Sequence, residues 1–397
     1  MRFPGILFFS LVNLFNYLDR YLVAGILPLI MADYGMSYSD GGLLFSAFVL
    51  GYVIFSPLFG YLGDRHSRIK LMALGVLLWS LATMASAAAL PLILFLGVRV
   101  MVGVGEASFG SIAPGYLKDR LNDPRKLQFA LSIFFCAIPI GSALGYVCGG
   151  FIASKLSWHY AFILCGLPGL LLALGLLFFK DDRIVVAPPP NLLRGVAEIC
   201  AIPCLVCAML GYACNSFALN GIATFVTKYG ESLGFANSSI TVIFGGILVV
   251  TGFAGTMIGG KLSEMYAERC ADPMAAMLRF IGVVSFIATP CVIGAFLASQ
   301  AWLFLTLCFF AELFIFATVT PVNAVLVRAA PPSLLTFTQG ASILVLNLFG
   351  ALPGPRLVGM LADRTSLGIG MQLSSLALFL SGVVWLGGGI MIARKKA

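Results

Sequence analysis

Long apolar stretches separated by short polar ones make up most of this chain of 397 residues. A helix needs about 20 apolar residues to cross the hydrocarbon core of a bilayer. Twelve segments have that length, and they are 5–30, 40–62, 69–90, 92–115, 127–152, 157–179, 196–228, 237–261, 275–297, 301–327, 334–360 and 370–393. They lack the strict alternation of barrel strands, and a backbone in lipid must satisfy its own hydrogen bonds. The pattern predicts an all-α membrane protein with twelve transmembrane helices.

The longest polar interruption, Lys180–Arg194, separates six of these segments from the other six. It contains three consecutive prolines, which cannot propagate a helix. The sequence therefore predicts an N-terminal six-helix bundle over 1–180, a cytoplasmic linker over 181–195 and a C-terminal six-helix bundle over 196–397.

The two halves resemble each other in sequence. The segment Gly60–Asp64 aligns with Gly260–Glu264 at an offset of 200 residues. Two glycine pairs match at an offset of 209, namely Gly141 and Gly145 with Gly350 and Gly354. Two six-helix halves repeated in parallel are typical of the major facilitator architecture. Twelve helices without an internal duplication are the alternative.

Composition and charge narrow the class of protein. The residues AVILMFWYC make up 60% of the chain and charged residues only 10%, against about 25% charged residues in soluble domains. This excludes a soluble enzyme, a secreted disulfide scaffold and a disordered chain. The net charge of +8 comes from basic residues in short loops, which does not indicate nucleic-acid binding.

The same basic residues predict the orientation in the membrane. If the N-terminus is cytoplasmic, 18 lysines and arginines fall on the cytoplasmic side and four on the other, the four being Lys155, Lys228, Arg356 and Arg364. Cytoplasmic loops carry such an excess. We therefore expect a multi-pass protein with both termini cytoplasmic, in a bacterial inner membrane.

No cofactor is expected, apart from protons as a coupling ion. Cys200, Cys204, Cys207 and Cys214 lie close together, but they lack the paired spacing and the histidine partners of a zinc site. We interpret the ten cysteines as small packing residues and expect no metal. The chain has no phosphate-binding loop for ATP hydrolysis and no catalytic constellation, so it is not expected to be an enzyme.

A charged motif follows the second predicted span. The residues Gly60-Tyr-Leu-Gly-Asp64-Arg65-His-Ser-Arg68-Ile-Lys70 match nearly all of the signature loop of the major facilitator superfamily. Gly60 permits close helix contact, and Asp64 can cap a neighbouring helix N-terminus. Arg65 and Arg68 can pair with carboxylates across the cytoplasmic seam. We interpret the motif as a cytoplasmic gate; the alternative is a solvated basic loop.

Five charged residues fall well inside predicted spans, and they are Asp19, Arg20, Arg99, Glu106 and Glu312. Each charge at mid-bilayer costs about 2.5–3.5 kcal/mol on the insertion scale, so each needs a partner or a wet cavity. Arg99 and Glu106 are seven residues apart, which places them on one helix face about 10.5 Å apart along the axis. Asp19 is expected near the depth of Glu106.

These groups predict a site for proton coupling. Burial disfavours the charged form of a carboxyl group, whereas a nearby arginine favours it. Our hypothesis makes Asp19 and Glu106 the proton acceptors and Arg99 their switchable counter-ion. Arg20 projects to a different face, toward a substrate phosphate or a neighbouring helix. The alternative is a static ion-pair network that only ties the first and fourth spans together.

Major facilitators bind substrate near the membrane midplane between their halves. Mid-span polar and aromatic residues are therefore candidate substrate contacts, and they are Asn16, Tyr52, Phe135, Asn215, Phe217, Asn220, Asn323 and Asn347. Each could instead make a helix-packing hydrogen bond. Glu312 could anchor a cationic head group, take a second proton or pair silently with a neighbour. Few candidates are charged, which favours an amphipathic substrate with a modest polar head.

Longer motifs resemble the spinster family of transporters. In the N-terminal half they are Asn16–Gly25, Glu106–Pro114 and Leu131–Tyr146, and in the C-terminal half Pro321–Asn323 and Gly350–Gly359. Glu106–Pro114 continues the segment Arg99–Glu106, which itself matches a pattern of the major facilitator superfamily. The resemblance implies proton-coupled movement of lysophospholipids or sphingoid phosphates by alternating access, with one polypeptide forming the pathway. Ala351 stands where this family usually has an acidic residue.

Two other functions remain open at this point. One is a proton-driven exporter of drugs or organic anions on the same fold. The other is a sensor that binds lipid without transporting it, which the intact motifs Gly60–Lys70 and Arg99–Glu106 disfavour.

Overall fold

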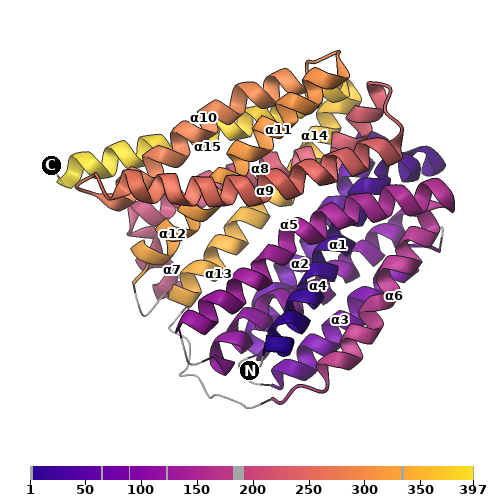
Figure 1. Cartoon of the computed structure of the whole chain (residues 1–397), viewed down its shortest axis with the longest axis horizontal. Coiled ribbons are helices and arrows are strands. Elements are labelled where there is room, and N and C mark those ends of the chain that lie inside the picture. The colour runs from indigo at the N-terminus through magenta and orange to yellow at the C-terminus, as the bar shows by residue number, and fades with distance from the viewer. Residues whose placement is uncertain are drawn as a thin grey trace. The chain divides into compact units, whose positions relative to one another are not determined.

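The computed structural model describes residues 3–63, 66–88, 90–121, 124–181, 192–331 and 335–396, and its regular elements there are helical (Figure 1). Twelve helical segments are long and apolar enough to cross a membrane, which confirms the predicted all-α fold with twelve spans. The first six spans are α1 (Phe3–Tyr34), α2 (Tyr38–Gly63), α3 (Arg68–Ala85), α4 (Leu92–Arg120), α5 (Pro124–Lys155) and α6 (Trp158–Leu176).

Three of the later spans are broken, where the sequence predicted continuous segments. The remaining elements are α7 (Leu192–Cys200), α8 (Pro203–Ser232), α9 (Asn237–Ala267), α10 (Pro273–Ala295), α11 (Ala301–Ala317), α12 (Val319–Ala329), α13 (Leu335–Leu346), a π-helical turn η2 (Asn347–Ala351), α14 (Pro353–Arg364) and α15 (Leu367–Lys396). The segment 196–228 breaks before Pro203, since proline favours the first position of a helix. The segment 301–327 breaks at Thr318, whose hydroxyl donates to the Ile315 carbonyl at 2.7 Å.

The break in the eleventh segment has a cause in its prolines. Pro353 and Pro355 have no N–H to donate to the preceding turn. The chain widens to a π-helical turn just before them, with Leu352 N–H donating to the carbonyl of Asn347 at 2.8 Å. Such π-turns are frequent at functional sites.

The chain forms two compact units, and each is described by itself. Unit 1 comprises Met1–Met36, Leu43–Ala187 and Gly230–Val249, and unit 2 comprises Ser37–Gly42, Pro188–Tyr229 and Val250–Ala397. Two helices therefore begin in one unit and continue in the other: α2 starts in unit 2, and α9 starts in unit 1. The division at 181–195 remains a prediction about the repeat, and most of that linker lies outside the described residues.

Glycines set the closest helix contacts in unit 1. A Cβ at Gly141 of α5 would collide with the carbonyl oxygen of Leu14, and one at Gly145 would lie 2.5 Å from that of Leu18. The backbones of α1 and α5 therefore touch, as small residues allow between helices in a membrane.

The matching glycines in unit 2 do the same. A Cβ at Gly350 would collide with the carbonyl of Ala213, and one at Gly354 would lie 2.9 Å from that of Phe217. Both contacts are made with α8, which forms most of the first predicted span of the C-terminal half, as α1 forms the first predicted span of the N-terminal half. The 209-residue repeat thus corresponds to one kind of contact in both units.

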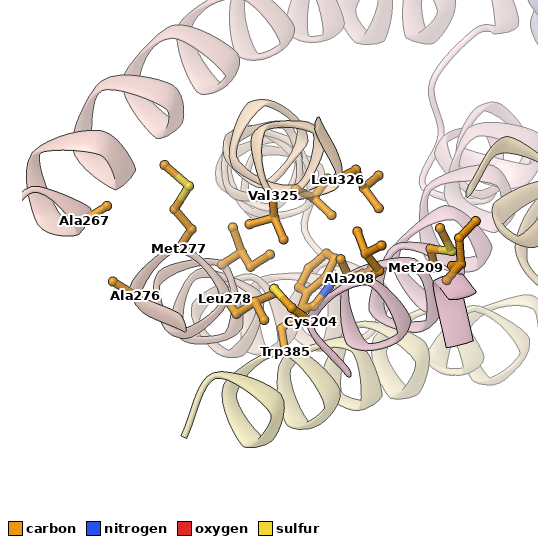
Figure 2. Packing of buried hydrophobic residues seen from close by; sticks show 14 residues of the cluster. Cys204, Ala208, Met209, Ala267, Ala276, Met277, Leu278, Val325, Leu326 and Trp385 are labelled. Carbon is orange, nitrogen blue, oxygen red and sulfur yellow. Dashed lines mark hydrogen bonds between the residues drawn. The ribbon is translucent and has the colours of Figure 1, made fainter. Parts of the chain in front are cut away.

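The core of unit 2 is apolar and centred on Trp385 of α15. Its indole Nε1 donates to the carbonyl of Ala208 at 3.2 Å. Met277 and Leu278 of α10 pack into the same cluster as Cys204 of α8 (Figure 2). Cys204 is therefore a packing residue, and none of the ten cysteines, all within the described ranges, forms a disulfide.

Candidate functional site

Four charged side chains lie together in unit 1, on α1 and α4. The side chains of Arg99 and Glu106 are fully buried, and Asp19 is 1% exposed. Arg20 retains 15% of its side-chain exposure. Two carboxylates and two guanidinium groups thus share one buried site, where each depends on the others for charge compensation.

One direct ion pair is present in this cluster. Arg20 donates to a single oxygen of Glu106, Oε2, from Nε at 3.2 Å and from Nη2 at 2.9 Å. The other carboxylate oxygen, Oε1, is buried and has no hydrogen-bond partner among the described residues. Glu106 therefore has one oxygen bonded to Arg20 and one free to accept a proton or another donor.

Aromatic rings surround the guanidinium of Arg20. Its Cζ lies 4.6 Å from the ring centroid of Tyr17, 4.8 Å from that of Phe48 and 4.9 Å from that of Tyr52. Such contacts stabilise a cation by about 0.5–2 kcal/mol. Tyr17 and Phe48 were not among the site residues predicted from the sequence. Their spacing was the available signal, because residues three or four apart share a helix face, as Tyr17 does with Arg20 on α1.

Arg99 is held differently from Arg20. All three of its guanidinium-group nitrogens, Nε, Nη1 and Nη2, lack a hydrogen-bond partner in the described part of the chain. Its Cζ lies 5.5 Å from the ring centroid of Phe48. The carboxylates of Glu106 and Asp19 are close enough to act on its charge. Arg99 is thus a buried cation compensated at longer range, without a bonded counter-ion.

Asp19 contributes further unused hydrogen-bonding capacity. It lies beside Trp79 and Thr83, which are one turn apart on α3. Its Oδ1, the Trp79 indole nitrogen and the Thr83 hydroxyl are all buried without a partner among the described residues. The cluster therefore contains more donors and acceptors than direct bonds, and this leaves it able to exchange partners.

Three of the candidate asparagines bond within their own helices. Asn220, Asn323 and Asn347 each donate Nδ2 to the carbonyl four residues earlier, at 2.8, 2.9 and 2.8 Å. Asn215 donates to the Thr318 hydroxyl at 3.3 Å, at the break between α11 and α12. Asn16 is buried, and its Nδ2 has no partner in the described chain.

The other substrate candidates are dispersed. Phe135 on α5 is 48% exposed. Phe217 lines a pocket of about 290 Å³ in unit 2 that also contacts Arg364 of α14. Glu312 on α11 is buried, and its Oε2 has no partner among the described residues. Tyr52 belongs to the Arg20 site, so of these candidates the structure brings only Tyr52 together with the charge cluster.

The predicted cytoplasmic gate is described only in part. Gly60 lies near the end of α2, whereas Asp64 and Arg65 lie outside the described residues. Arg68 begins α3, and its Nε donates to the carbonyl of Gly63 at 3.2 Å, at the end of α2. Arg68 thus joins the two helices that flank the loop.

The repeat of this motif in unit 2 forms an ion pair. Glu264, which aligns with Asp64, accepts two hydrogen bonds from Arg328 of α12, both at 3.0 Å. Both side chains are exposed, at 44% for Arg328 and 41% for Glu264. Within the described chain, no group of three or more histidine, cysteine or acidic side chains could hold a metal ion.

Twelve membrane spans with a buried charge cluster define a class of protein, the secondary transporters. Residues 9–355 match the Major Facilitator Superfamily, so the chain belongs to this superfamily of transporters and is not an enzyme. It is a multi-pass integral membrane protein.

Within that superfamily the chain belongs to the spinster family. It is 31% identical to protein spinster homolog 1 of Xenopus tropicalis, over 96% of this chain and 78% of that relative. It is 30% identical to the sphingosine-1-phosphate transporter SPNS2 of Danio rerio, over 96% of this chain and 82% of that one. A solved bacterial homologue of the human lysosomal transporter spinster, inward-facing and occupied, shares the fold with a TM-score of 0.83 at 21% identity, over 98% of this chain and 96% of that chain.

Proposed function

We propose that this protein is a proton-coupled secondary transporter that moves lysophospholipids or related amphipathic lipids, such as sphingoid phosphates, by alternating access. The observation that carries the proposal is the bond from Arg20 to one oxygen of Glu106, beside two groups without a partner among the described residues, the guanidinium of Arg99 and Oδ1 of Asp19. The substrate class is supported by the relative named as a sphingosine-1-phosphate transporter.

The coupling step follows from the unequal bonding of the two arginines. A proton that binds Oε1 of Glu106 removes the negative charge that attracts Arg20. Arg20 is then free to meet an anionic substrate, while Arg99, the switchable counter-ion, turns from Glu106 to Asp19, which is the second proton acceptor. Loss of the proton restores the pair between Arg20 and Glu106, and this competes with the substrate for Arg20. Two discrete arrangements of one charge cluster can in this way link proton and substrate binding.

Arg20 is suited to a phosphate group for two reasons. A planar guanidinium binds phosphate oxygens through two parallel donors. The rings of Tyr17, Phe48 and Tyr52 orient that guanidinium and offer an apolar surface next to it. In unit 2, buried Glu312 is the proposed anchor for a cationic head group or a second proton-binding group.

The orientation in the membrane and the cytoplasmic gate also stay proposals. The excess of basic residues on one predicted side supports cytoplasmic termini. We further propose a bacterial inner membrane as the location and a monomer as the working unit. Gly60, Asp64, Arg65 and Arg68 are proposed as the cytoplasmic gate.

A liposome assay tests the substrate class. Purified protein is reconstituted, and uptake of labelled lysophospholipid and of a sphingoid phosphate is compared with a panel of cationic dyes, with and without a pH gradient. Protein-free liposomes and the Arg20→Ala variant are the controls. Lipid uptake that requires both Arg20 and the gradient supports the proposal. Movement of dyes alone would indicate a drug exporter, and failure of counterflow for every bound ligand would indicate a sensor.

A further inference from the structure

The start of α2 is held by α14 within unit 2. The backbone N–H groups of Tyr38 and Ser39 donate to the two carboxylate oxygens of Asp363, at 2.7 and 2.8 Å. Arg356, two turns earlier on α14, donates from Nη1 to the carbonyl of Ser39 at 3.2 Å. The first turn of α2 is therefore bonded to α14 through two of its backbone donors and one acceptor.

The two backbones also touch at this place. A Cβ at Gly359 of α14 would collide with the carbonyl oxygen of Tyr38. One turn later on α2 and one turn earlier on α14, a Cβ at Gly42 would collide with the carbonyl oxygen of Pro355. Glycine at both positions is what allows Asp363 to reach the start of α2.

Asp363 caps a helix other than its own. The first N–H groups of a helix have no partner inside it and carry a partial positive charge, which a carboxylate stabilises. The start of α2 already has a local cap: Ser37 Oγ accepts from Asp40 N–H at 3.2 Å, and Asp40 accepts from Ser37 N–H at 3.3 Å. The bonds to Asp363 are therefore additional to local capping, and they tie α2 to α14.

The sequence of this contact repeats the motif at the other end of α2. Gly359-Met-Leu-Ala-Asp363-Arg364 has the same pattern as Gly60-Tyr-Leu-Gly-Asp64-Arg65: glycine, any residue, leucine, a small residue, aspartate and arginine. In the predicted orientation, Gly60–Arg65 is cytoplasmic and Gly359–Arg364 lies on the opposite side. The chain thus carries one copy of the pattern on each predicted side.

Unit 1 contains a counterpart without the charge. The start of α9 lies on α1 and α5, with Asn237 Nδ2 donating to the carbonyl of Gly25 at 3.0 Å. A Cβ at Gly150, 209 residues before Gly359, would collide with the hydroxyl of Thr241. The residue 209 before Asp363 is Ser154, whose hydroxyl donates to Phe151 of its own helix at 2.8 Å.

We propose that Asp363, Arg356 and Gly359 form an outer latch, which holds the start of α2 against α14 while the predicted extracytoplasmic side is closed and releases it when that side opens. The uncharged contact at Gly150 opens in the same step. Asp363 acts as a positioning residue, since it contacts the backbone of α2 and not the charge cluster. This inference rests on the alternating access of the proposed function.

Hydrogen–deuterium exchange on the full-length protein in nanodiscs, without substrate or pH gradient, tests the latch. Asp363→Asn removes the charge and replaces one of the two accepting oxygens by an NH2 group that cannot accept, which shifts the docked-to-released ratio about tenfold toward release. Peptides covering 37–42 and 237–249 are both expected to exchange faster, and Asp363→Glu is expected to restore part of the protection. Because no lipid or proton movement is measured, failure of the proposed substrate or coupling leaves this result unaffected.

Matched control variants distinguish a latch between α2 and α14 from a local effect on the start of α2. Asp40→Asn removes the same charge from the same helix start but breaks only the local cap, so faster exchange is expected at 37–42 alone. If Asp363→Asn gives that same local pattern, or no change, the latch is refuted.

If Asp363→Asn does not fold, Gly359→Ala is compared with Gly387→Ala, where a Cβ meets open space. The latch is supported if exchange becomes faster at both 37–42 and 237–249 in Gly359→Ala but not in Gly387→Ala. It is overturned if the two variants show the same exchange rates at these peptides.

Discussion

Arg20 on α1 donates two hydrogen bonds to one carboxylate oxygen of Glu106 on α4, at 3.2 and 2.9 Å. Arg99, on the same helix as Glu106, has no bonded partner among the described residues. The two arginines therefore differ in how firmly they are held. A change of charge on Glu106 therefore alters the ion pair with Arg20 directly, and it alters the electrostatic potential at Arg99, which is not bonded to Glu106.

The bond between Arg20 and Glu106 should appear as a coupling energy. Removing one member of a buried ion pair costs about 3–5 kcal/mol, because the other charge stays buried without a partner. Arg20→Met is therefore expected to lower the thermal unfolding midpoint clearly, and the double variant Arg20→Met with Glu106→Gln to recover part of the loss. Thermal unfolding of the wild type, both single variants and the double variant forms the cycle. Additive effects would show that the two side chains do not interact.

The close approach of α2 and α4 next to the charge cluster depends on Gly103. A Cβ at Gly103 of α4 would collide with the carbonyl of Phe48 on α2, while a Cβ at Gly97 of the same helix meets open space. Overpacking costs about 1–3 kcal/mol, so Gly103→Ala is expected to lower the unfolding midpoint. Gly97→Ala should leave it unchanged or raise it, since alanine favours a helix by about 1 kcal/mol over glycine. Similar midpoints for the two variants would contradict the close approach of α2 and α4.

The contributions of Glu312 to folding stability and to transport can be measured separately. Its Oε2 has no partner in the described chain, so Glu312→Gln breaks no bond at that oxygen. We expect the unfolding midpoint to stay the same or rise, because a buried charge is removed. If Glu312 anchors a cationic head group, uptake of a choline lysolipid falls relative to a glycerol lysolipid. A parallel loss for both head groups would favour a second proton-binding group instead.

The spans could be predicted from sequence because their signal is local. Twenty apolar residues in lipid leave little choice but a helix, and all twelve predicted spans occur. The breaks were not predicted, since the apolar pattern runs on without change through Thr318 and through the π-helical turn at Asn347–Ala351. Hydropathy does not register which backbone bonds a proline removes a few residues later.

The charge cluster was predicted as a set but not in its pairing. Burial cost alone identifies Asp19, Arg20, Arg99 and Glu106 as a group that must share a site. Which arginine reaches Glu106 depends on how α1 and α4 are rotated and spaced, and this is a property of tertiary packing. The contact of Asp363 with the start of α2 is likewise long-range in sequence, although the repeated pattern around Gly359 was a visible signal.

Transport by a Glu106→Gln variant under an imposed pH gradient tests whether Glu106 couples proton movement to lipid movement. Lysophospholipid uptake into proteoliposomes is measured with and without the gradient for the wild type, for Glu106→Gln and for Glu264→Gln, whose carboxylate lies in the exposed pair with Arg328. We expect the gradient to drive accumulation in the wild type and in Glu264→Gln, and we expect Glu106→Gln to move substrate only down the substrate's own gradient. Accumulation by Glu106→Gln that responds to the pH gradient as the wild type does would contradict this role of Glu106.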